Sequence, residues 1–384
     1  MKYKLGEICE IISGSTPKTG IPEYWDGTQK WITPAELNED TYIITDSIRK
    51  LTELGVEKAG LSSFPEGTVI LSSRAPIGKV AIAGCEMYCN QGFKNLICSE
   101  KINNHYLYWF LKGRTEYLNS LGRGATFKEI SKQIVSNIEI DVPPIEQQKR
   151  AVNQLEKANA IIQLRKQQLQ KLDELVKARF VEMFGDLVVG NKIKTNRHKI
   201  GDIAFVTKLA GFEFTKYVQY KECGDIIMLR GLNCKKGKLV LDDIKWIDKA
   251  TSDLLPRSKL YYGDILMTYA GTIGDVAMVD ADDKYHLAPN VAKITLKEEA
   301  YNPIFLMHLF LYTNNYIMTF ASKVAQASIN MGKIRNLEYF FPDIDMQNWF
   351  ATFVEQVDKS KYVVQKALDE AQLLFDSLMQ QYFG

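Results

Sequence analysis

The chain repeats one long pattern, and this repeat limits its fold more than any other feature. The segment GTVILSSRAPIGKVAIAG at 67–84 aligns without a gap with GDILMTYAGTIGDVAMVD at 263–280, a separation of 196 positions (263 minus 67). Each copy contains a run of apolar β-formers, a break with glycine, and a second apolar run, which is typical of two strands joined by a turn. The sequence therefore predicts the same β-hairpin twice.

The repeat extends over nearly the whole chain. The matching segments follow the same order in both halves: KLGEICEIISG from Lys4 with KIGDIAFVTKLAG from Lys199, NQGFKNLI (90–97) with APNVAKIT (288–295), NNHYLYWFL (103–111) with NPIFLMHLF (302–310), and GATFKEIS with QASINMGK. From Asn137 and Asn336 onward the separation is fixed at 199 (336 minus 137) as far as Gly185 and Gly384. Self-similarity of this kind predicts two homologous modules in tandem.

Each copy ends in a segment with the pattern of a long helix. Residues 149–184 contain neither glycine nor proline. Apolar residues spaced three and four apart recur in both copies, at Leu155, Ala158, Ile162, Leu169, Leu172 and Val176, and at Val354, Val357, Val364, Leu368, Ala371, Phe375 and Leu378. Only Arg165 and Lys361 interrupt this stripe, which is typical of a coiled coil. We expect the two helices to pair antiparallel about an approximate twofold axis; the alternative is that each packs only on its own globular module.

These patterns predict an α+β fold of two tandem modules and two long helices. The predicted boundaries are a first module at 1–142, a central helix at 143–186, a linker at 187–198, a second module at 199–341 and a distal helix at 342–384. The linker GDLVVGNKIKTNRH is rich in glycine, asparagine and charge, as expected of a connection between modules.

Composition narrows the class of protein. No apolar run approaches the roughly 18 residues that a membrane span needs, and the start MKYKLGEICEIISG lacks the apolar core of a signal peptide, so we expect a cytoplasmic protein that makes no membrane contact. The six cysteines form no CxxC pair, which argues against a metal site or a disulfide framework. The net charge of +2 means that any binding to nucleic acid must come from local basic patches.

The sequence shows no familiar catalytic or cofactor motif. The Gly-Lys pairs at Gly78, Gly237 and Gly332 lack the surrounding residues of a phosphate-binding loop. The NPIF segment differs from a methyltransferase Asn-Pro-Pro-Tyr/Phe loop, and it reads better as Asn302 capping a helix whose first residue is Pro303. We therefore expect a binding protein that is not itself an enzyme and holds no cofactor or metal of its own.

Taken in order, the paired openings, the paired hairpins, NQGF with PNVA, GATFKEIS with QASINMGK, and DVPPIEQQ (141–148) with FPDIDMQN (341–348) resemble the specificity subunit of Type I restriction-modification enzymes over the full chain. The resemblance implies two target recognition domains, each reading one half of a gapped double-stranded DNA sequence. It also implies that the two helices set the spacing and dock two methyltransferase subunits. The replacement of the usual PPxxEQ by FPDIDMQN makes docking at the distal helix less certain.

By the same resemblance, the assembly methylates adenine N6 with S-adenosylmethionine. With two restriction subunits, whose presence the sequence leaves open, it would cut unmodified DNA with ATP and Mg. These cofactors would belong to the partner subunits. The alternative from another class is a coiled-coil scaffold that spaces two protein-binding domains and does not bind DNA.

The turns of each module supply the candidate DNA contacts, because polar and basic side chains on loops can reach base edges and phosphates. In the first module the candidates are Thr16, Lys18, Ser72, Ser73, Arg74, Lys79, Arg123, Thr126, Lys128 and Lys132. In the second they are Arg230, Asn233, Lys235, Lys236, Thr268, Tyr269, Thr272, Ser328, Asn330, Lys333 and Arg335. The competing interpretation is that the hairpins are structural and the charges are only solvated.

Overall fold

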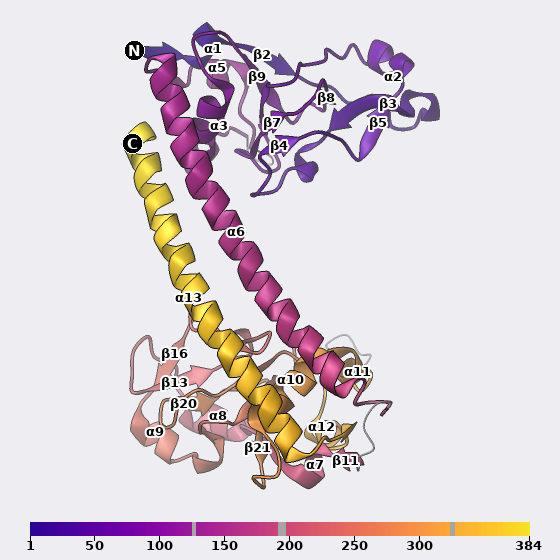
Figure 1. Ribbon diagram of the computed structural model, residues 1–384, viewed down its shortest axis with the longest axis vertical. Helices are drawn as coiled ribbons and strands as arrows, with labels where there is room; N and C mark the ends of the chain where they lie inside the picture. The colour runs from indigo at the N-terminus through magenta and orange to yellow at the C-terminus, as the bar shows by residue number, and fades with distance from the viewer. Residues whose placement is uncertain (125–127, 191–196, 323–326) are drawn as a thin grey trace. The chain divides into compact units, whose positions relative to one another are not determined.

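The computed structural model describes residues 1–124, 128–190, 197–322 and 327–384. The chain divides into two compact units (Figure 1). Unit 1 comprises Met1–Lys166 and Lys366–Gly384, and unit 2 comprises Gln167–Gln365. Each unit contains one of the repeated modules and a part of each long helix, and each is described by itself below.

Unit 1 is a mixed α/β module. Its elements before the long helix are β1 (Lys2–Lys4), α1 (Leu5–Ile8), β2 (Cys9–Ser13), η1 (Pro22–Tyr24), β3 (Trp25–Ile32), η2 (Pro34–Glu36), β4 (Ile43–Ile44), β5 (Arg49–Leu51), α2 (Glu53–Lys58), β6 (Val69–Leu71), β7 (Val80–Ala83), β8 (Tyr88–Cys89), β9 (Lys94–Cys98), α3 (Asn104–Lys112), α4 (Thr115–Ser120), α5 (Lys132–Ser136) and β10 (Glu139–Asp141). The main sheet has the order β2-β9-β6-β7-β4, with β4 parallel to β7 and the other neighbours antiparallel. A second sheet has the order β5-β3-β8, and β1 pairs with β10.

Unit 2 repeats this plan. Its elements are β11 (Arg197–Lys199), α7 (Ile200–Ile203), β12 (Ala204–Lys208), α8 (Gly211–Tyr217), β13 (Ile226–Leu229), η3 (Gly231–Asn233), β14 (Cys234–Lys235), β15 (Lys238–Leu239), β16 (Lys245–Ile247), α9 (Lys249–Asp253), η4 (Pro256–Ser258), β17 (Lys259–Leu260), β18 (Ile265–Thr268), β19 (Val276–Met278), β20 (Tyr285–Leu287), β21 (Val291–Leu296), α10 (Pro303–Tyr312), α11 (Asn314–Met318), α12 (Met331–Arg335) and β22 (Glu338–Phe340). The sheets have the orders β12-β21-β18-β19, β16-β13-β20-β17, β14-β15 and β11-β22.

The predicted hairpins are confirmed in both units. Strand β6 pairs antiparallel with β7, placing Val69 opposite Ile82, and β18 pairs with β19, placing Ile265 opposite Met278. The side chains of both hairpins are almost all buried between the sheets and the adjacent helix, which explains their apolar composition. The units differ beside the hairpin, where β4 extends the sheet of unit 1 and the β14–β15 hairpin lies next to β19 in unit 2.

The helix caps also follow the sequence. The Asn103 side chain accepts a hydrogen bond from the backbone of Tyr106 at 3.0 Å at the start of α3. At the start of α10, Asn302 accepts from Ile304 at 2.9 Å, with Pro303 as the first helical residue. The prediction of a capped helix in place of a methyltransferase loop is therefore confirmed.

Two helices of 40 residues close the repeats, α6 (Ile145–Phe184) and α13 (Ile344–Phe383). Each begins four residues earlier than the proline-free stretch suggested, directly after Pro144 and Asp343, because proline can occupy the first turn of a helix. In unit 1 the beginning of α6, with Leu155, packs with Phe375 and Leu378 near the end of α13. In unit 2 the end of α6 packs against the beginning of α13, where the rings of Phe180 and Phe350 lie 5.3 Å apart. The helices are therefore antiparallel within each unit, and the predicted stripe lies in their contact. In the described ranges, no helix is both long and apolar enough to cross a membrane.

Candidate nucleic-acid interface

The hairpin turn of unit 1 is held by a buried hydroxyl group. Ser72 donates to the Pro76 carbonyl at 2.7 Å and accepts from the backbone N–H of Lys79 at 2.8 Å. The Lys79 ammonium donates to the carbonyls of Pro34 at 2.9 Å and Leu37. Both predicted contacts therefore have internal roles, because Ser72 shapes the turn and Lys79 ties it to the segment around η2.

Unit 2 uses the same device. The Thr268 hydroxyl donates to the Thr272 carbonyl and accepts from the Asp275 N–H at 3.0 Å. Thr268 is buried, whereas Thr272 is exposed at the tip of the turn. A hydroxyl residue at equivalent positions 72 and 268 was the only signal of this role in the sequence, and it did not show which way the side chain points.

The structure brings together two segments that the sequence nominated separately. The carbonyl of Ser73 accepts from Ile130 N–H at 3.0 Å, and at the equivalent place the carbonyl of Tyr269 accepts from Ile329 N–H at 2.9 Å. In each unit the segment before α5 or α12 thus adds to the edge of the hairpin turn. Candidates from both segments consequently lie on one surface of each unit.

One acidic residue balances the cations beside the turn of unit 1. Glu129 lies 3.8 Å from Arg74 and 3.2 Å from Lys94 in ion pairs. Lys94 is 7% exposed and also donates to the buried Ser73 hydroxyl at 3.3 Å. Sequence reasoning missed Lys94 and Glu129, because their charges meet only when β9 and the segment before α5 lie beside the turn.

An open cavity of about 690 Å³ adjoins this turn. It is lined by Thr33, Pro34, Ala35, Arg74, Ala75, Pro76, Ile77, Asn90, Asn119 and Lys128. Lys128 is exposed, and no described residue forms an ion pair with it. Asn119, which the sequence did not single out, donates to the carbonyls of Ile77 and Thr115. The cavity therefore presents one free ammonium group and one partly exposed guanidinium.

The remaining candidates of unit 1 lie around the same module. Thr16 donates to the Gln91 side chain at 2.5 Å. Lys18, Arg123 and Lys132 are exposed, and the Arg123 backbone pairs with Glu129 through two hydrogen bonds of 3.0 Å. Thr126 lies outside the described residues.

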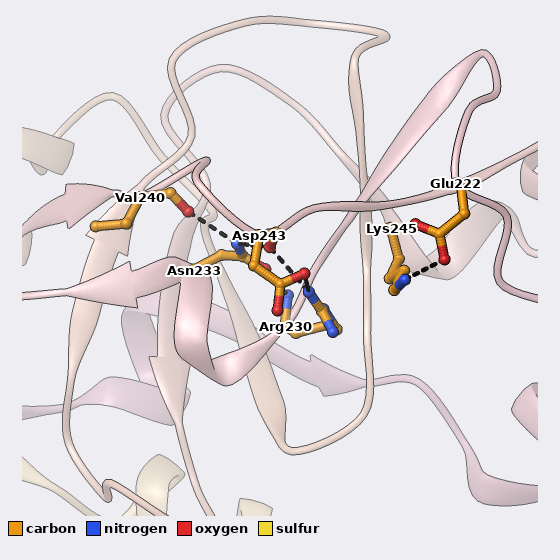
Figure 2. A network of polar contacts seen from close by, with 6 residues as sticks. All are labelled: Glu222, Arg230, Asn233, Val240, Asp243 and Lys245. Carbon is orange, nitrogen blue, oxygen red and sulfur yellow. Dashed lines mark hydrogen bonds and ion pairs between the residues drawn. The ribbon is translucent and has the colours of Figure 1, made fainter. Parts of the chain in front are cut away.

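Two candidates of unit 2 form the polar network drawn in Figure 2. Arg230 donates to the Asp243 carboxylate and carbonyl, both at 2.8 Å. Asn233 is fully buried, and its amide donates to the carbonyls of Val240 at 2.8 Å and Asp243 at 2.9 Å. Both side chains thus fix the 240–243 loop.

The adjacent β14–β15 turn carries free positive charge. Lys236 and Gly237 have φ of 49° and 84°, the consecutive positive values of a tight hairpin turn. Lys235, Lys236 and Lys238 are exposed, and none of them forms an ion pair with a described residue. Three ammonium groups therefore lie in four residues at the tip of this hairpin.

The other candidates of unit 2 mostly have internal partners. The Tyr269 hydroxyl accepts from Asn290 N–H at 3.3 Å, and Ser328 is half-buried. Asn330 caps α12. The Lys333 ammonium donates to Phe320 O and the Arg335 guanidinium to Val206 O, both at 2.7 Å. DNA contact by any of the nominated residues stays a prediction.

Comparison with known proteins agrees with this duplicated architecture. The family model described as "Type I restriction modification DNA specificity domain" matches residues 1–174 and 194–371. The chain is 39% identical over 186 residues to the Type I restriction enzyme MjaIX specificity subunit of Methanocaldococcus jannaschii, covering 48% of this chain and 43% of that protein. It is 22% identical to the MjaVIII specificity subunit, covering 95% and 89%, and 20% identical to the EcoBI specificity subunit of Escherichia coli, covering 83% and 73%.

Solved structures share the fold. The Type-I restriction-modification system S subunit from M. genitalium aligns with a TM-score of 0.59 at 11% identity, covering 100% of this chain and 96% of that one. A chain from a structure on complex assembly and conformational transition of the type I R-M system aligns with a TM-score of 0.61 at 15% identity, covering 100% and 97%. With two α+β modules in tandem, each followed by a long helix, and with the family model matched in both halves, the chain belongs to the Type I restriction-modification specificity subunits.

Proposed function

We propose that this chain recognises DNA for a Type I restriction-modification complex, with each module reading one half of a gapped double-stranded target. The observation that carries the proposal is a conserved frame with different turns. The hairpin, the capping asparagines and the long helices recur in both units, whereas Arg74 and Lys128 beside the turn of unit 1 correspond to Ala270 and the Ala327–Ser328 region in unit 2. Different side chains on one frame suit two different half-sites.

Physical chemistry favours this division of labour. One module can reach only a few base edges in a major groove, and each mismatched pair costs roughly 1–3 kcal/mol. Two linked modules combine their discrimination and leave the bases between the half-sites unread. In unit 1, Arg74 and Lys128 at the open cavity are the side chains we favour for DNA contact, because both retain exposed surface.

In unit 2 the β14–β15 turn is suited to bind the DNA backbone. Its three exposed lysines lack internal acceptors among the described residues, so they can approach phosphates without breaking an ion pair. Arg230 would first have to exchange its contacts with Asp243. We therefore assign Lys235 and Lys236 to phosphate contact ahead of Arg230 and Asn233.

The helices carry candidate docking positions for two methyltransferase subunits. Leu164 and Val363 are 63% and 65% exposed, and Leu175 and Leu374 are 47% and 53% exposed. Both pairs are separated by 199 positions (363 minus 164, 374 minus 175), the period of the repeat. Unit 1 thus presents Leu164 and Leu374, and unit 2 presents Leu175 and Val363. Exposed aliphatic residues that recur in this way fit two equivalent partner sites.

Catalysis would reside in the partners. Adenine N6 methylation would use S-adenosylmethionine bound by the methyltransferase subunits, and cleavage of unmodified DNA would use ATP and Mg bound by restriction subunits where these are present. The specificity subunit would supply the target sequence and the geometry of the complex.

A module exchange tests the proposal. Residues 1–142 are replaced by the first module of another family member, the chain is co-expressed with its methyltransferase, and the host genome is sequenced for modified bases. We expect one half of the methylated motif to change and the other to remain. A change in both halves, or in neither, would contradict modular reading.

A salt titration separates this function from that of a protein-binding scaffold. Binding of a DNA duplex to the purified chain should weaken steeply between about 50 and 200 mM salt, because counterions released from phosphates are bound again. Absence of DNA binding at low salt, together with retained assembly on protein partners, would favour the scaffold.

A further inference from the structure

A short segment after α6 covers one strand of unit 2. The Leu187 side chain is buried, and its carbonyl accepts from Phe340 N–H of β22 at 2.9 Å. Gly190 lies against the ring of Phe340, because a Cβ atom at this glycine would come within 2.4 Å of it. Residues 186–190 thus cover the outer edge and one face of β22.

The equivalent strand of unit 1, β10, has an open edge. Asp141 corresponds to Phe340 at a separation of 199. Met1 and Val142 exchange two backbone hydrogen bonds, at 3.1 and 2.8 Å, so the next pair, Lys2 and Asp141, is a non-hydrogen-bonded pair. The Asp141 N–H therefore points away from β1, and no described residue accepts from it.

A cavity of about 410 Å³ occupies this place in unit 1. We call it the β10 groove, lined by Lys2, Phe110, Arg114, Tyr117, Asn137, Glu139, Asp141, Tyr382, Phe383 and Gly384. The ion pair between Lys2 and Glu139 is 65% and 56% exposed, whereas the equivalent pair of Arg197 and Glu338 is only 43% and 36% exposed. The difference is in the direction expected from the cover that residues 186–190 give to β22.

The groove wall contains a donor that suits an acidic group. The Arg114 guanidinium donates to Phe383 O through Nη2 at 2.6 Å, but its Nε is buried and has no acceptor among the described residues. The equivalent residue of unit 2 is Thr313, which is bonded to Tyr339. Since an unpaired buried donor is costly, the groove favours an occupant with an acceptor near Arg114. The covering segment of unit 2 has Asp186 directly before Leu187.

We propose that the β10 groove binds an extended segment of a methyltransferase subunit in which an acidic residue precedes an aliphatic one. A backbone carbonyl of the segment accepts from Asp141 N–H, the aliphatic side chain fills the cavity, and the carboxylate pairs with Arg114. This is strand addition at a free edge. The groove adjoins the end of α13, the helix that presents the exposed Leu374 in the same unit. The identity of the partner rests on the proposed function.

Hydrogen exchange at the Asp141 amide tests the inference. The rate is measured in the isolated chain and in its complex with methyltransferase subunits, whose formation is checked by mass. We expect at least tenfold slower exchange in the complex, with the Phe340 amide protected in both. If the complex forms and the Asp141 rate is unchanged, the inference is wrong. If no complex forms, the proposed docking function fails, and the partner assignment fails with it.

Two variants test the groove itself. Appending Asp-Leu-Val-Val-Gly after Gly384, the sequence of residues 186–190, should slow exchange at Asp141 in the isolated chain, whereas Asp-Asp-Val-Asp-Gly should not. Equal rates for the two extensions would contradict a site for an aliphatic residue. Arg114→Thr, which introduces the residue of unit 2, should reduce the protection in the complex, with circular dichroism as the check of folding.

Discussion

The side-chain oxygen of Gln148 accepts a hydrogen bond from the backbone N–H of Asn103 at 2.8 Å. The same relationship recurs between Gln347 and Asn302 at 3.0 Å. Each glutamine lies in the first turn of a long helix and is essentially unexposed, and each asparagine caps the helix that packs beneath the hairpin. The two bonds therefore fasten each module to its long helix at the same place in both repeats.

Gln148→Met should destabilise unit 1. The amide also donates to Lys101 O at 3.0 Å and Pro143 O at 2.8 Å, so methionine would leave one donor and two acceptors unpaired. With a cost of about 1–3 kcal/mol for a buried unpaired group, we expect a loss of about 2–4 kcal/mol in the free energy of unfolding, measured with urea. Gln147→Met, at an exposed neighbour, is the control and should change it by less than about 0.5 kcal/mol. Similar losses in both variants would show that the buried amide contributes little.

His308 should make unit 2 sensitive to acid. Burial lowers its pKa from 6.5 to about 3; the Lys361 charge adds to the shift, and Asp173 opposes it. Below pH 6.5 the unfolded chain therefore binds a proton that the folded chain does not, and stability falls by about 1.4 kcal/mol per pH unit until pH approaches the folded pKa. We expect this histidine to cost about 2 kcal/mol between pH 6.5 and 5.

Urea unfolding at several pH values checks this expectation, with His308→Phe as the matched variant. Phenylalanine keeps the aromatic contact with Phe350 and cannot titrate, so its slope of stability against pH should be shallower than that of the wild type. Parallel slopes for the two proteins would mean that His308 is protonated in the folded state.

Removing two lysines from the β14–β15 turn should change the salt dependence of DNA binding. Each phosphate contact contributes about 0.9 to the slope of log K against log salt. Lys235→Ala/Lys236→Ala should thus lower the slope by nearly 2 and weaken binding to matched and mismatched duplexes alike, as fluorescence anisotropy would show. Lys149→Ala/Lys359→Ala removes the same charge from exposed helix positions. If this control reduces the slope equally, the effect is one of net charge.

The sequence predicted the frame because local chemistry determines it. Apolar runs such as Val69–Leu71, the Asn302-Pro303 cap and the stripe through Leu155 each specify an element through spacing and propensity alone. The antiparallel packing within each unit also follows, since an apolar stripe needs a partner of the same length.

The polar surface was less predictable, because a hydroxyl or a lysine has similar local preferences whether it faces inward or outward. Ser72 and Asn233 were nominated for DNA contact and are buried in internal hydrogen bonds. Lys94 was overlooked, although it meets Glu129 across 35 positions of sequence. Such roles depend on which segments meet after folding, and a repeat reveals only that they meet in the same way twice.

The last prediction concerns the gap between the half-sites. Both long helices continue from one unit into the other, at Lys166–Gln167 in α6 and at Gln365–Lys366 in α13. Four helix-forming residues inserted at both places lengthen each helix by about 6 Å and turn it by about 40° beyond one full turn, at 1.5 Å and 3.6 residues per turn. One base pair advances about 3.4 Å and rotates by about 34–36°.

If the helices set the spacing, the methylated motif should keep both half-sites and gain about one or two unread base pairs, since displacement and rotation change together along the duplex. Four residues also shift the heptad pattern, so the coiled coil must unwind locally and should lose some stability. Modified-base sequencing of a host that expresses the variant with its methyltransferase gives the gap directly. Two intact half-sites at the original gap would show that other parts of the complex determine the spacing.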